Sequence, residues 1–129
     1  PGGLTVGWDL WDTSRLSWEE WRSLLRRGLR GAGSFQIHCW SDERQWITLA
    51  LEYGTEKPAP WHWGTVIEGP VTPACRAMLL GLQRPAPQGG YQKFTPFFSI
   101  FLDNGFGSFH YGAELVQGRP GPLPFSDEP

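Results

Sequence analysis

A chain of 129 residues, 40% of them apolar, has the size and composition of one folded domain, which argues against a disordered body. Its formal net charge of -2 gives no electrostatic basis for nucleic-acid binding, which normally needs a basic surface. No apolar run is long enough to span a bilayer, and two cysteines are too few for a disulfide framework, so we expect a protein of the reducing cytoplasm.

Aromatic residues are the unusual feature of the composition. The chain contains eight tryptophans and eight phenylalanines. A tryptophan buries a large area when it packs in a core, and it also dominates the energetics of binding surfaces. The excess therefore indicates either a tightly packed core or an adhesive face.

The first predicted helix begins after Ser17. Ser17 and Glu20 form a capping-box pattern, in which the hydroxyl and the carboxylate each accept a backbone N–H. Apolar residues then recur at helical spacing, at Trp18, Trp21, Leu24, Leu25 and Leu29. Four arginines fill the other side, at Arg22, Arg26, Arg27 and Arg30. The glycines at positions 31 and 33 end this helix.

Alternating residues predict a strand over residues 34–40, with Gln36, His38 and Trp40 on the face opposite its apolar side chains. Residues 43–53 fit two structures. Their apolar residues alternate as in a strand, whereas their polar residues recur at a spacing of four as in a helix. We interpret this segment as a helix.

A further strand is predicted over residues 63–69, after two prolines at positions 58 and 60. Thr72 followed by Pro73 is a favoured helix start, because a hydroxyl caps the first turn and proline suits the first helical position. That helix is expected to continue through residues 74–82.

A β-hairpin is the strongest local prediction. Residues 97–103 and 106–116 flank Asn104-Gly105, the pair that most favours a two-residue type I′ turn. This turn would place Ser99 opposite His110, on the face of the hairpin that does not belong to the core.

The end of the chain differs in composition from the rest. Residues 117–129 are rich in proline and glycine and are predicted to form a tail or linker after a single domain at residues 1–116. For that domain we expect an α+β fold. It would contain a mixed or antiparallel sheet of about four strands, three helices packed mainly on one face, and a β-hairpin at the end.

Catalysis is the weaker of two functional hypotheses. His110 beside Ser99 could act as a general base for a nucleophilic hydroxyl, with Glu114 orienting the imidazole, as in a small hydrolase or transferase. The chain has no strained Gly-x-Ser-x-Gly elbow to expose the serine. A serine opposite a histidine is also a common pair in β-sheets without any catalytic role.

Binding is the hypothesis that we prefer. The aromatic residues of the predicted outer face are Phe97, Phe101 and Phe106, beside His110. Trp61 and Trp63 flank a histidine and point the same way in an extended chain. They would either stack on a sugar, a base or a proline-rich ligand or cap the core beneath a loop. Arg26 and Arg27 offer a docking surface for an acidic partner, or simply a solvated helix face.

The sequence predicts no metal site and no cofactor. The three histidines fall in three separate segments, and no Cys-x-x-Cys or His-Glu-x-x-His spacing occurs. Cys39 is expected to face the core, and Cys75 lies near a helix N-terminus, where a thiol pKa can fall. Packing is the simpler explanation for both cysteines.

These observations favour a non-enzymatic protein-interaction domain that binds a protein partner, with nucleic acid and membrane disfavoured. A small bacterial inhibitor of the toxin-immunity or antitoxin type is the specific example that we expect.

Overall fold

The computed structural model describes residues 9–86 and 93–125, and these form an α+β domain. A seven-stranded, fully antiparallel sheet runs through them in the order β1-β7-β6-β5-β2-β4-β3. The strands are β1 (Asp9–Asp12), β2 (Ser34–Trp40), β3 (Thr55–Lys57), β4 (Gly64–Pro70), β5 (Ser99–Leu102), β6 (Phe106–Phe109) and β7 (Glu114–Gln117).

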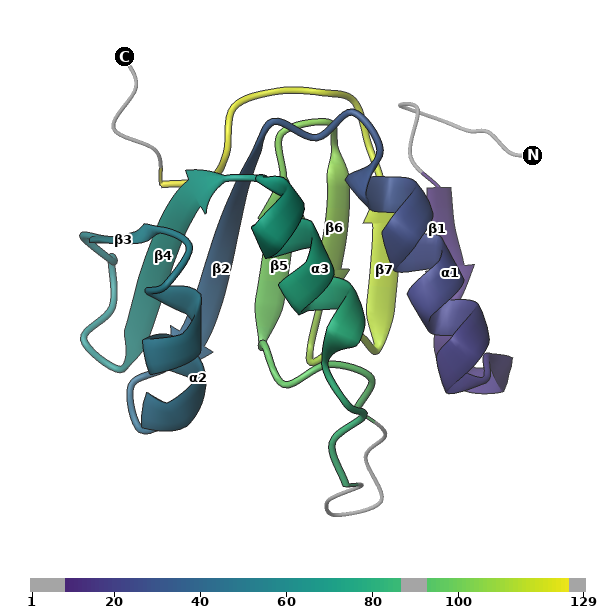
Figure 1. Cartoon of the computed structure of the whole chain (residues 1–129), viewed down its shortest axis with the longest axis horizontal. Helices are drawn as coiled ribbons and strands as arrows, with labels where there is room; N and C mark the ends of the chain where they lie inside the picture. Colours follow the sequence, from purple (N-terminus) through teal and green to yellow (C-terminus); the bar gives the residue numbers. More distant parts are fainter. Residues whose placement is uncertain (1–8, 87–92, 126–129) are drawn as a thin grey trace.

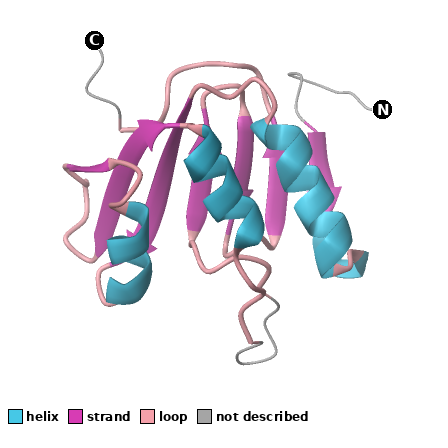
Figure 2. Cartoon of the chain, viewed as in Figure 1, coloured by secondary structure: helices cyan, strands magenta, loops and turns pink. Residues whose placement is uncertain are grey.

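Three α-helices lie together on one face of the sheet (Figure 1, Figure 2). They are α1 (Trp18–Leu29), α2 (Arg44–Ala50) and α3 (Pro73–Gly81), and a short 3₁₀ helix, η2 (Thr13–Arg15), precedes α1. Residues 44–50, which fit either structure in the sequence, are therefore helical. None of the described helices combines the length and the apolar character needed to cross a membrane.

The expected sheet of about four strands was wrong, because the described residues form seven. β1 and β3 are short edge strands with little apolar alternation. The segment over residues 106–116, expected as one strand, is two strands that pair with each other. His110, Tyr111 and Gly112 separate them with φ values of 55°, 60° and 91°, and three successive left-handed residues reverse the chain.

The hairpin between β5 and β6 is present, but the type I′ turn was wrong. Of the central pair only Gly105 has a positive φ, 94°, and its amide donates to the carbonyl of Leu102 at 3.1 Å. The loop is therefore three residues long, and the register moves by one. Asn104 explains this change, because its amide group donates to the carbonyls of Gly28 and Arg30 at 2.8 and 3.0 Å and so caps the end of α1.

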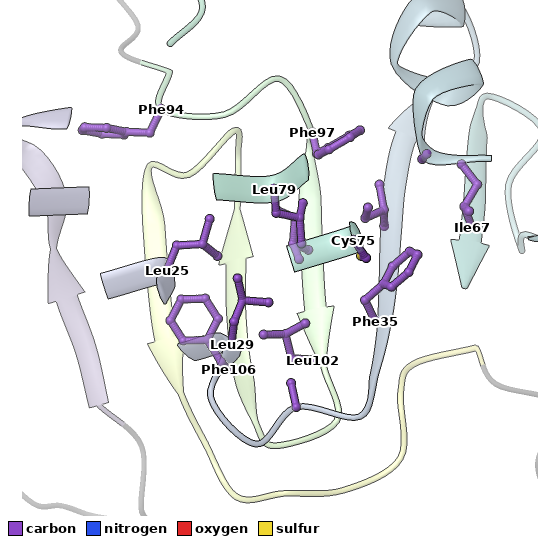
Figure 3. Packing of buried hydrophobic residues seen from close by; sticks show 14 of the residues in the cluster. Leu25, Leu29, Phe35, Ile67, Cys75, Leu79, Phe94, Phe97, Leu102 and Phe106 are labelled. Carbon is purple, nitrogen blue, oxygen red and sulfur yellow. The ribbon is translucent and has the colours of Figure 1, made fainter. Parts of the chain in front are cut away.

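The core lies between the helices and the sheet. Ser17 and Glu20 form the predicted capping box at the start of α1. Leu25 and Leu29 of this helix are fully buried, and Figure 3 shows them gathered near Phe106 of the sheet. Phe35, Ile37, Cys39, Ile100, Leu102 and Leu115 supply much of the sheet side of this core.

Gly28 makes the close approach of α1 to the sheet possible. A Cβ atom at this position would lie 2.7 Å from Cδ2 of Phe106 and closer to two other ring atoms. The Phe106 ring is 2% exposed and has little room to move aside. We therefore expect Gly28→Ala to lower the free energy of unfolding by about 1–3 kcal/mol, as overpacked cores do.

Gly81→Ala is the matched control. Gly81 also lies in a helix, but nothing lies within 4 Å of a Cβ atom there. This substitution should be neutral or stabilise the protein by up to about 1 kcal/mol, because alanine loses less backbone entropy than glycine on folding. Denaturant unfolding of both variants measures the difference, and equal effects would contradict the packing of α1 on β6.

Candidate functional site

The candidate site lies on the face of the sheet that the α-helices do not cover, here called the open face. Side-chain alternation along β2 places Phe35, Ile37 and Cys39 in the core, and so directs Gln36, His38 and Trp40 to the open face. In the neighbouring strand β5, Ser99 pairs with His38 and Phe101 pairs with Gln36, which places both β5 residues on the same face.

A hollow of about 250 Å³ lies on the open face and is lined mainly by aromatic rings; we call it the aromatic pocket. Its lining includes His38, Trp40, Trp61, Trp63, Phe98, Ser99, Phe101 and Phe125. The Trp63 ring stacks on Trp40 and on Trp61, with centroids 4.8 and 5.0 Å apart. Trp63 is nevertheless 49% exposed, so it offers a large apolar surface to a ligand.

The loop before β4 holds two of these tryptophans. The amide of Ser41 donates to the carbonyl of Trp63 at 2.8 Å, and the Ser41 hydroxyl donates to the carbonyl of His62 at 3.3 Å. Gly64 gives the Trp61 ring its space, because a Cβ atom there would lie 2.7 Å from Cε3 of that ring. Trp61 and Trp63 both line the aromatic pocket.

A polar group built around Gln36 borders this pocket. The Gln36 side chain is fully buried, and its amide nitrogen donates to Oε1 of Glu68 at 2.9 Å and to the carbonyl of Pro124. Because the amide nitrogen makes both of these bonds, Oε1 of Gln36 faces Nε2 of His38, 2.6 Å away. Nε2 of His38 must therefore carry the proton and donate it.

Burial keeps His38 neutral. The residue is 6% exposed, and desolvation lowers its pKa from 6.5 to about 4. The ring also lies among aromatic neighbours, with centroids 4.9 Å from Phe101 and 5.5 Å from Trp61. At neutral pH the site therefore contains an uncharged imidazole in an apolar setting.

The segment after β7 borders one end of the open face. It leaves β7, passes the ends of β6 and β5 beside the turn that joins them, and continues toward β2 and β4 (Figure 1). The amide of Gly118 donates to the carbonyl of Gly105 at 2.8 Å, and the amide of Gly121 donates to that of Asp103 at 3.1 Å. A second hollow of about 290 Å³ borders this segment, with Phe101 in the lining of both hollows.

The observed register removes the expected pairing of Ser99 with His110, whereas His110 and Glu114 lie close together. Ser99 is opposite Phe109, not His110, and it is 6% exposed within the lining of the aromatic pocket. His110 lies in the loop beyond β6, where its ring packs edge-on against Phe98 at 5.5 Å. Nδ1 of His110 is 3.6 Å from Oε2 of Glu114, and both side chains are about half exposed.

The other predicted site residues fall into three places. Phe97 and Phe106 are buried in the core, at 0% and 2% exposure. Phe101, Trp61 and Trp63 line the aromatic pocket. Arg26 and Arg27 are exposed on α1, in the helical layer on the other side of the sheet.

Sequence reasoning missed Gln36, His38, Trp40, Phe98 and Phe125 as site residues. The alternation of β2 already separated the first three from the core side chains, so a signal for them was present. Phe98 and Phe125 lie outside regular strands, and only the tertiary structure brings them to the pocket.

The two cysteines are both free and buried. Burial raises the pKa of Cys39 to about 12 and that of Cys75 to about 11, so both thiols stay protonated at neutral pH. Within residues 9–86 and 93–125, no three histidine, cysteine, aspartate or glutamate side chains come together in a way that could hold a metal ion.

The lowered pKa of His38 predicts a pH-dependent stability. Between pH 6.5 and about 4 the unfolded chain binds a proton at this residue and the folded chain does not. Protonation of His38 therefore has little effect on the free energy of unfolding above pH 6.5. Below that pH the free energy of unfolding decreases as the pH falls toward 4. Melting temperatures measured from pH 7 to pH 5 should fall more steeply for the wild-type chain than for His38→Gln, and parallel curves would contradict this assignment.

The open face thus combines aromatic rings, one neutral imidazole and one buried amide around a single pocket. Such groups bind by stacking and by hydrogen bonding. No protein-family model matches the chain, and no match was found among curated proteins or among solved structures. What the pocket binds is therefore inferred from its own chemistry.

Proposed function

We propose that this chain is a non-enzymatic protein-interaction domain that binds its partner at the aromatic pocket of the open face. The observation that carries this proposal is the stack of Trp40, Trp63 and Trp61 around a hollow of about 250 Å³. Tryptophans that surround a pocket and remain partly exposed are typical of the residues that dominate binding energy. The rings are held in place before binding, which lowers the entropy lost on association.

The chemistry of the pocket supports binding more than catalysis. The pocket has few polar groups. His38 is neutral, and its Nε2–H already donates a hydrogen bond to Oε1 of Gln36. The thiol of Cys39 faces the core, and burial keeps it protonated. A reacting substrate would need an activated nucleophile beside a base. Ser99 is opposite Phe109 on one side and His38 on the other, and Nε2 of His38 is already hydrogen-bonded to Gln36.

A small hydrolase or transferase centred on His110 is the second candidate. Two observations favour it: the approach of His110 to Glu114 and the left-handed backbone of His110, a conformation often found at functional sites. An activated-ester assay separates the candidates. Turnover that is lost in His110→Gln would support the enzyme, whereas equal background rates in both chains would support the binding domain.

A small inhibitor of the toxin-immunity or antitoxin type is the specific form of interaction domain that we favour. Modest size and slight acidity motivate it, together with an aromatic face that could cover part of another protein. Both cysteines are free and buried, which supports the cytoplasm as the compartment of this protein.

Affinity capture with two variants tests the proposal. Trp63→Ser removes the most exposed ring of the pocket, and we expect at least a tenfold loss of captured partner, since truncating a binding hot spot costs about 2 kcal/mol or more. The matched control is Arg26→Gln combined with Arg27→Gln, which changes an exposed surface in the helical layer. Mass spectrometry of proteins captured from a lysate of the source organism measures the difference.

The three chains should first show similar melting temperatures, so that a loss of capture reports on binding. Equal capture by the wild-type chain and Trp63→Ser would contradict the proposed site. Loss in the arginine variant alone would place the interface on α1.

A further inference from the structure

The segment over residues 118–125 occupies part of the open face as a ligand would. The carbonyl of Pro124 accepts a hydrogen bond from the amide of Gln36. The ring of the next residue, Phe125, lies 5.6 Å from His38 and 5.3 Å from Trp61, and it approaches Trp61 edge-on. A proline carbonyl and the following aromatic ring are thus held by separate groups of the face.

The groups that hold Pro124 are suited to a peptide carbonyl. Gln36 is fully buried, and its amide is oriented by Glu68 on one side and by His38 on the other. One amide hydrogen goes to Glu68, so the second must find another acceptor or remain unsatisfied inside the protein. This buried donor therefore selects a ligand with a carbonyl oxygen at that position.

The rest of the face suits proline and aromatic side chains. Pro122 and Pro124 border the second hollow together with Phe101, and Phe125 borders the aromatic pocket. Proline-rich segments bind well to aromatic surfaces, because their extended conformation is already formed and little entropy is lost.

The tethered segment fills this site incompletely. Phe125 is 45% exposed and has a φ of 55°, a strained value for an aromatic residue. Trp63 keeps half of its surface exposed while the segment is in place. A peptide that is not tied to β7 could place its aromatic ring in the pocket without this backbone strain.

We propose that the open face binds an extended segment of a partner protein in which a proline directly precedes an aromatic residue. Residues 118–125 hold the same site when no partner is bound, and the partner displaces them. This inference rests on the proposed function, and it adds the chemistry of the partner and a built-in competitor. The competitor is effective because its short connection to β7 gives it a high local concentration.

The test uses a fluorescent peptide with the sequence of residues 118–125, added to the 129-residue chain and its variants. Phe125→Gly removes the ring of the competitor and relieves its positive φ. We expect the peptide to bind this variant at least tenfold more tightly than it binds the wild-type chain. A peptide carrying Phe125→Ala should bind at least tenfold more weakly than the original peptide.

Leu123→Gly is the matched control, since it adds the same backbone freedom to the segment without removing the ring that contacts His38 and Trp61. It should behave like the wild-type chain. In NMR spectra, the peptide should shift indole N–H signals of tryptophans in the aromatic pocket. The signal of Trp21, whose indole donates to Gly112 at 2.9 Å, should not move.

Three results of the binding measurements would overturn the inference: no binding to Phe125→Gly, equal binding to Phe125→Gly and the wild-type chain, or equal tightening by Leu123→Gly. A wild-type dimer that Phe125→Gly dissociates would also overturn it, because the occupant would then be a second copy. If the peptide does not bind, but Trp63→Ser still captures less of a partner than the wild-type chain, the proposed interaction domain is supported and only the proposed partner chemistry is wrong.

Discussion

The structure depends on the packing of all three α-helices on one face of an antiparallel sheet. Their apolar residues, such as Leu25, Ala50 and Leu79, form one core with the alternate side chains of the strands. A sheet of this kind normally exposes polar residues on its other face. Here the other face carries Trp40 and Phe101, so its apolar surface has to be covered by loops or by a partner.

Two irregular segments cover parts of that face, and both contribute residues to the aromatic pocket. The loop before β4 places Trp61 and Trp63 over the end of β2. The segment after β7 runs along the β5–β6 turn and reaches the open face at Pro124 and Phe125. The segment after β7 is irregular and held by a few hydrogen bonds, which makes it easier to displace than a strand or a helix. The buried amide of Gln36 in β2 donates to the carbonyl of Pro124 and so links the sheet to the segment after β7. The same donor is the group that we propose binds a partner's carbonyl.

Much of the fold follows from local signals. Ser17 and Glu20 predicted the start of α1, Thr72 and Pro73 that of α3, and alternation predicted β2. Long-range contacts decided the rest. The side chain of Asn104 caps α1, which changes the hairpin loop and moves the register by one residue. Similarly, the aromatic pocket joins residues from four distant segments, and only Trp61, Trp63 and Phe101 were predicted as binding residues.

The proposed role of the open face depends on the contact of Phe125 with His38 and Trp61, and proton–proton NOEs can detect this contact. With the Phe125 ring centroid 5.6 Å from His38 and 5.3 Å from Trp61, its ring protons should show NOEs to both rings. Its ring signals should also be shifted by the neighbouring aromatic groups. Random-coil shifts for Phe125, with no NOE to either residue, would contradict this account of the face.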